Sequence, residues 1–176
     1  MTKPLPSLAL EMSQEGIALH QLAYDGHWHE LARVALNDPA LRARLSNMKS
    51  IATKLEGRRI KAQIWLPEDQ IITGTFSILG ADEKSRLSNA ASEIAAKFGG
   101  KPKDYLVHLG KRQSGGAFPV SAVRVRTLQE ARTFAKSHGF KARCYSTQSE
   151  IEGFATPPVF VLPADKSRPR NHMVLQ

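Results

Sequence analysis

The sequence contains little cysteine and no long hydrophobic run. Its single cysteine, Cys144, cannot form an intramolecular disulfide, which fits a reducing compartment. No apolar run approaches the roughly 20 residues that span a bilayer, and segment 1–10 lacks the apolar region of a signal peptide. We therefore expect a cytoplasmic protein in which Cys144 is a buried, unreactive thiol in a strand.

The motifs of common catalytic and cofactor-binding sites are also missing. There is no Walker A loop and no G-x-G-x-x-G after a strand, and Gly115 and Gly116 lie between two predicted strands, where a hairpin turn accounts for them. No Ser-His-Asp or Cys-His arrangement follows from the spacing. Aromatic residues make up only 7% of the chain, so a stacking platform for single-stranded nucleic acid has no support. We expect no enzyme activity and no cofactor.

Acidic residues are outnumbered by basic ones, which gives a formal net charge of +9. Such a charge favours an anionic partner, such as nucleic acid, acidic lipid headgroups or an acidic protein, although solubility alone also explains it. The basic residues that we consider for phosphate contacts lie on one face of the first predicted helix and just after it: Arg42, Lys49, Lys54, Arg58, Arg59 and Lys61. A solvated helix face is the simpler interpretation of the same pattern.

Hydrophobic periodicity predicts eight strands and three helices around the central stretch 59–79, where two strands flank the polar corner 67–70. The predicted strands are 7–13, 16–24, 27–36, 59–66, 71–79, 105–111, 117–126 and 141–146, and the helices are 38–56, 81–98 and 127–138. This order indicates an α/β or α+β domain with a mixed sheet and three helices. We expect a flexible lead-in over 1–6, one domain over 7–146, and an extended or disordered tail over 147–176.

Turn and edge signals refine the strand prediction. The pair Asp25-Gly26 favours a two-residue type I′ hairpin, which needs positive φ at both positions. Pro119 places the beginning of its strand at a sheet edge, because proline cannot donate to a ladder.

Capping signals refine the helix prediction. Asn37 is placed to cap the first helix, and Asp82 lies near the start of the second. Thr127 and Glu130 have the spacing of a capping box for the third.

Two side-chain groups could hold a metal. His27 and His29 share a face of the third predicted strand, and His20 lies across the ladder near them, although no cysteine or carboxylate at zinc-ligand spacing accompanies them. Glu11, with Glu68 and Asp69, resembles the carboxylates that bind Mg²⁺ in ribonuclease H-like nucleases. No third acid is clearly placed, and Glu68-Asp69 is equally suited to a turn.

Three stretches carry a resemblance to a known family. They are LALEMSQEGIALHQL, IWLPEDQIITGTFSIL and VSAVRVRTLQEARTFAKSHGF. In this order they resemble the first half of the actin-like cytoplasmic domains of pilus-assembly PilM and type II secretion GspL, which are bacterial proteins. Residues 11–15 match the opening strand and turn, 66–67 the end of the middle strand, and 138–140 the helix end, and the resemblance covers about residues 7–146.

The departures from that family bear on function. Ser13 occupies the position where the family has the glycine that approaches nucleotide phosphates, and Glu11 occupies the position of the family's acidic residue. The second, nucleotide-completing lobe is not in this chain. The resemblance therefore implies a single lobe of ribonuclease H/actin-like topology that does not bind or hydrolyse ATP.

The family resemblance implies a scaffold role as a cytoplasmic adaptor. We expect a non-enzymatic protein-interaction domain of a larger assembly, associated with the membrane through a partner, with strand addition at a free sheet edge as the docking mode. A basic protein that contacts RNA or DNA backbone phosphates is the alternative, and a metal-dependent nuclease is a third hypothesis. The identity of the partner and the oligomeric state stay open.

Overall fold

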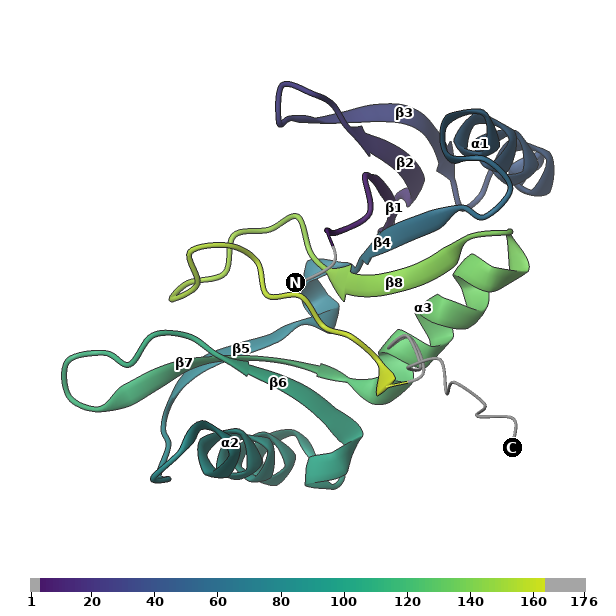
Figure 1. Cartoon of the computed structure of the whole chain (residues 1–176). Helices are drawn as coiled ribbons and strands as arrows, with labels where there is room; N and C mark the ends of the chain where they lie inside the picture. Colours follow the sequence, from purple (N-terminus) through teal and green to yellow (C-terminus); the bar gives the residue numbers. More distant parts are fainter. Residues whose placement is uncertain (1–3, 164–176) are drawn as a thin grey trace, which may run out of the picture.

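Two β-sheets form the frame of the molecule (Figure 1). The computed structural model describes residues 4–163. The first sheet has the strand order β3-β2-β1-β4-β8, and its strands are β1 (Leu8–Met12), β2 (Gly16–Leu22), β3 (Trp28–Ala35), β4 (Lys61–Trp65) and β8 (Lys141–Ser146). The second has the order β5-β7-β6, and its strands are β5 (Ile72–Ser77), β6 (Tyr105–Leu109) and β7 (Ala117–Arg124).

The first sheet is mixed, as the sequence predicted. Strands β1, β2 and β3 form an antiparallel meander, whereas β4 lies parallel to both β1 and β8. Helices α1 (Leu41–Glu56) and α3 (Val125–Ser137) contribute to one core cluster with this sheet. The helix residues that are buried there are Leu45, Met48, Ala52, Leu128, Ala131 and Ala135. Leu55, near the end of α1, is 45% exposed.

The second sheet has its own helix and its own smaller core. Helix α2 (Glu83–Phe98) buries Ala90, Ile94 and Ala95 against the sheet, with Val120 and Ala122 of β7 in the same cluster. The polar corner after β4 is a short 3₁₀ turn, η1 (Glu68–Gln70), and a similar turn, η2 (Pro102–Asp104), precedes β6. Strands β4 and β5 therefore do not pair, because the corner carries the chain from one sheet to the other.

The predicted mixed sheet and three helices are confirmed within residues 4–163, and the second sheet is the part that the sequence did not predict. None of the helices in this range is long and apolar enough to cross a membrane.

Pro119 lies in the central strand of the second sheet, so its predicted position at a sheet edge needs correction. On one side it is opposite Thr75 of β5. On the other side its carbonyl accepts a hydrogen bond from Gly110 N, just beyond the last residue of β6. The missing N–H of proline therefore faces a point where the β6 ladder has ended, which explains why a central strand tolerates it.

The β2–β3 connection is longer than the predicted two-residue turn. Ala23 N donates to His27 O, and Gly26 N donates to Ala23 O. Asp25 has negative φ, whereas Gly26 has a φ of 82°. A type I turn followed by a left-handed glycine forms this three-residue hairpin, so the type I′ prediction was wrong.

Two of the three predicted helix starts differ from the structure. Helix α1 begins at Leu41 rather than next to Asn37, with Asp38 accepting a hydrogen bond from Ala40 N. The predicted capping box of α3 does not form, because the helix begins at Val125, which places Thr127 inside its first turn, and Glu130 pairs with Arg126. At α2 the expectation is confirmed, since the Asp82 carboxylate accepts from Ser85 N at 2.7 Å.

The first part of the predicted tail packs in the core. Ile151, Phe160 and Leu162 are buried in the main cluster, and Phe160 forms a two-bond antiparallel bridge with Tyr145 of β8. Residues 147–163 are therefore not a free tail. The rest of the predicted tail, 164–176, lies outside the described residues, as do residues 1–3 of the lead-in.

Candidate functional site

A buried histidine and carboxylate meet on the face of the first sheet opposite α1 and α3. His20 Nε2 lies 2.6 Å from Glu11 Oε2, and Arg33 donates to the same oxygen at 3.2 Å. The His20 side chain is 7% exposed, and its ring lies against Trp65, with a centroid distance of 4.9 Å. Trp28 packs edge-on against Trp65. These contacts pair His20 Nε2 and Glu11 Oε2 within the domain, as is typical of buried polar groups with a structural role.

The same cluster shows how charge is balanced at the edge of this sheet. Arg33 also binds both carboxylate oxygens of Glu30, which holds the pKa of Glu30 below its usual value. The pKa of Arg33 is raised, chiefly by its hydrogen bond to Glu30. Both groups are therefore charged over the whole neutral range.

The three histidines do not converge on a metal site. A β-bulge after Leu19 shifts the register, so that His20 lies opposite Glu30 and Gln21 lies opposite His29. His20 and His29 therefore point to opposite faces, because neighbouring strand residues alternate. His29 lies 3.5 Å from Asp25 in the exposed hairpin instead. In the part of the chain that the structure describes, no group of three His, Cys, Asp or Glu side chains could hold a metal ion.

The carboxylates considered for a nuclease are each engaged separately. Glu11 binds His20, whereas Asp69 Oδ2 accepts from Gln14 Nε2 at 3.1 Å and Glu68 Oε2 accepts from Ser149 at 3.2 Å. Within residues 4–163 these carboxylates are not part of any group of three His, Cys, Asp or Glu side chains that could hold a metal ion.

The β1–β2 turn, which would approach nucleotide phosphates in an actin-like fold, is closed by its own hydrogen bonds. Ser13 N donates to Gly16 O, and Ser13 Oγ lies 3.3 Å from Gly16 N. Gln14 ties the turn to Asp69. The carboxylates of Glu15 and Asp69 make this position repulsive to a phosphate group. The backbone N–H of Ser13 and the side chains of Ser13 and Gln14 are thus engaged within the domain.

The six basic residues predicted for anion binding are all exposed. Among the described residues, none of their side chains forms a hydrogen bond or an ion pair. Arg42 and Lys49 line a groove between α1 and α3, whereas Lys54, Arg58, Arg59 and Lys61 do not line it. The structure therefore separates two of the six from the other four.

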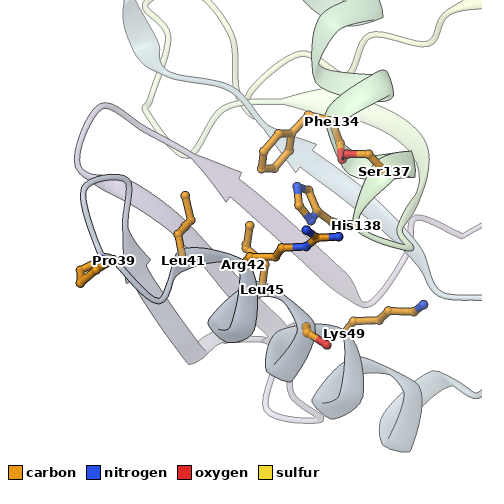
Figure 2. A pocket seen from close by; sticks show the side chains of 9 residues that line it. Pro39, Leu41, Arg42, Leu45, Lys49, Phe134, Ser137 and His138 are labelled. Carbon is orange, nitrogen blue, oxygen red and sulfur yellow. Dashed lines mark hydrogen bonds between the residues drawn. The ribbon is translucent and has the colours of Figure 1, made fainter.

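The groove has a volume of about 720 Å³ and combines cationic and apolar walls (Figure 2). Its lining residues are Pro39, Leu41, Arg42, Leu45, Ser46, Lys49, Phe134, Ser137 and His138. Figure 2 shows the guanidinium of Arg42 extending toward His138, with Phe134 on the α3 side. The α3 wall could not be predicted from local sequence, because Phe134 and His138 are distant from Arg42 along the chain.

Within residues 4–163, the edge strand β5 lacks the charge, proline, bulge and backbone bridge that protect such edges, and only its first exposed residue, Thr73, lines a pocket with the segment 147–152. Strand β3 carries a bulge and the charged pair Glu30 and Arg33, and β8 is covered by its bridge to Phe160. Strand β6 contacts the segment 147–163 through His108 Nε2 and Val159 O, which lie 2.7 Å apart. Strand β5 has no charge, proline or bulge. An edge of this kind is suited to pairing with a further strand.

The register shows which β5 groups point to the open edge. The Pro119 carbonyl faces Gly110, away from β5, so Thr75 and Pro119 form a non-hydrogen-bonded pair. The N–H and C=O of Thr75 therefore point away from β7. By alternation the same holds for Thr73 and Ser77, whose side chains are exposed.

Comparisons with known proteins show the fold of the chain. No family model and no curated protein matches the sequence. The cytoplasmic domain of EpsL, an inner membrane component of the type II secretion system of Vibrio cholerae, matches with a TM-score of 0.55 at 14% identity, covering 78% of this chain and 55% of that one. The PilM-PilN type IV pilus biogenesis complex matches with a TM-score of 0.50 at 14% identity, covering 78% and 46%.

The chain thus spans about half the length of these structures. The resemblance expected from the sequence is confirmed at the level of the fold, which the chain shares with these two structures over 78% of its length.

Proposed function

We propose that this domain is a non-enzymatic, cytoplasmic docking module of a larger, membrane-associated protein assembly, and that β5 receives an extended segment of a partner protein. Support comes from the fold, which it shares with an inner membrane component of a secretion system and with part of a pilus biogenesis complex. The closed, acidic β1–β2 turn argues against a nucleotide-driven activity.

The unprotected β5 edge is the observation that carries the docking mode. Thr73, Thr75 and Ser77 direct their backbone polar groups outward, and an added strand would pair with them through main-chain hydrogen bonds. Such bonds provide affinity, whereas side chains on alternate positions provide specificity. The partner therefore needs an extended segment with free backbone N–H and C=O groups at its point of contact.

A single substitution tests this mode. Thr75→Pro removes an N–H that points to solvent and leaves the hydrogen bonds between β5 and β7 intact. Thr75→Val is the matched control, because it changes the side chain but keeps the N–H. Both variants and the wild type are used for affinity capture from a native lysate, with and without nuclease.

We expect the wild type and Thr75→Val to retain the same defined proteins after nuclease treatment, and Thr75→Pro to lose them. Retention by all three forms would remove β5 from the proposal. Recovery of nucleic acid alone would favour the second candidate function.

That second candidate is binding of RNA or DNA backbone phosphates. It is favoured by the six exposed basic side chains around α1, which have no partners within the described residues. Their contacts would release counterions, so affinity for an oligonucleotide should fall steeply as salt is raised. A shallow dependence between 50 mM and 200 mM salt, measured by fluorescence anisotropy, would exclude this function.

A further inference from the structure

The charged side chains that line the groove between α1 and α3 are all basic. Its walls carry Arg42, Lys49 and His138, and no aspartate or glutamate is among the described residues that line it. Nearby acids are already paired: Asp38 binds Arg44 at 2.8 Å, and Glu130 of α3 binds Arg126 at 2.9 Å. Arg42 and Lys49 thus remain available to an anionic group from outside the described domain.

The floor of the groove is apolar. Leu41 and Phe134 are partly buried hydrophobic residues packed on the main core, and Leu45 below them is buried. The Phe134 ring also lies against His138, with a centroid distance of 4.6 Å. An occupant therefore gains from burying an apolar side chain as well as from its charge.

The spacing of the two cations suits a regular segment. Arg42 and Lys49 are seven residues apart on one helix, which puts their Cα atoms about 10 Å apart, or two helical turns. Carboxylates at the same separation on a partner helix would meet both. The apolar side chain between them would face Leu41 and Phe134.

We propose that this groove binds an acidic amphipathic helix of a partner protein, with carboxylates on Arg42 and Lys49 and an apolar anchor on Phe134. This interface is separate from β5 and does not depend on the proposed function. A nucleic-acid backbone fits less well, because it would use all six basic residues equally and would gain nothing from the apolar floor.

Synthetic peptides provide the probe. The first is a fluorescein-labelled helix about three turns long, with leucine at i, i+4 spacing on one face and glutamate on both flanks. A second peptide has lysine in place of glutamate, and a third has alanine in place of leucine. Binding is measured by fluorescence anisotropy at low and physiological salt, and a single-stranded oligonucleotide is measured in parallel.

Charge reversals on α1 locate the contact. Arg42→Glu and Lys49→Glu each remove one charge-assisted contact, so each should weaken binding of the acidic peptide about tenfold. Lys54→Glu is the matched control, because it makes the same charge change at an exposed position of the same helix outside the groove. Its effect should stay below about threefold. Circular dichroism melting verifies that all three variants fold.

Each outcome decides the proposal. Preference for the acidic leucine peptide over both others, with loss confined to Arg42→Glu and Lys49→Glu, supports it. Equal binding of acidic and basic peptides overturns it, and so does equal weakening by Lys54→Glu. Tighter binding of the oligonucleotide, sensitive to all three reversals, would assign the surface to nucleic acid instead.

Discussion

Replacing Phe160 by alanine tests whether the segment 147–163 belongs to the folded domain. Phe160 is 1% exposed, and its ring packs against the His108 ring with a centroid distance of 4.9 Å. Its backbone makes both hydrogen bonds of the bridge to Tyr145. Truncating a fully buried phenylalanine costs about 3–5 kcal/mol. That is a large fraction of the roughly 5–15 kcal/mol by which such domains are stable.

Urea unfolding, followed by the fluorescence of the two tryptophans, Trp28 and Trp65, measures this cost. With a slope of about 2 kcal/mol per M, a loss of about 4 kcal/mol lowers the midpoint by about 2 M. Phe98→Ala is the matched control, because Phe98 is 39% exposed and should lose less than about 2 kcal/mol. Hydrogen exchange at the Tyr145 amide should also accelerate in Phe160→Ala. A loss below about 1 kcal/mol, with unchanged exchange, would refute the conclusion that this segment is part of the core.

Three further predictions concern charge, backbone and the thiol. Arg33 lowers the pKa of Glu30, so their pairing stabilises the fold above the unfolded carboxyl pKa, and this stability is lost as pH falls through the folded pKa. The melting temperature should therefore fall more between pH 7 and pH 3 in the wild type than in Arg33→Gln. Gly139→Ala and Gly57→Ala should each cost about 1–2 kcal/mol of stability, since both positions have positive φ. Only Gly139→Ala displaces the Lys49 side chain in the groove wall, so only this variant should weaken binding of the acidic peptide. Cys144 should react with a thiol reagent only in denaturant, and reaction of the native protein would contradict its burial.

Elements with strong local patterns were predictable from the sequence. The last strand matches its predicted bounds, and Asp82 caps its helix, because alternation and capping depend on a few neighbouring residues. Membership of a sheet depends on distant partners, so the same alternation in β4 and β5 could not show that they lie in different sheets. Pro119 illustrates the limit, since its tolerance in a central strand depends on where β6 ends.

The segment 147–163 was misjudged for a related reason. Its buried residues, Ile151, Phe160 and Leu162, are isolated among prolines and polar residues, so they show no period that indicates a helix or a strand. Their burial comes from contacts with β8 and the main core. Composition alone therefore predicts a tail where tertiary packing provides an ordered segment.

The candidate site was predictable only in part. Arg42 and Lys49 follow from charge on one helix face, whereas the facing wall of α3 is more than eighty residues away and could not be inferred from local spacing. The histidine cluster failed because one bulge changes the face of every residue beyond it. Local pattern thus located the cations, and only the fold showed which of them border an apolar floor.

The two proposed interfaces lie on different parts of the frame. The edge strand β5 belongs to the second sheet, and the groove is formed by α1 and α3 on the first (Figure 1). They share no residue, and their supporting side chains belong to separate core clusters. A partner at one interface therefore leaves the other accessible, and without a shared two-state element the coupling between them should be close to zero. Independent sites of this kind suit a scaffold, because such a domain holds two components together without requiring either to bind first.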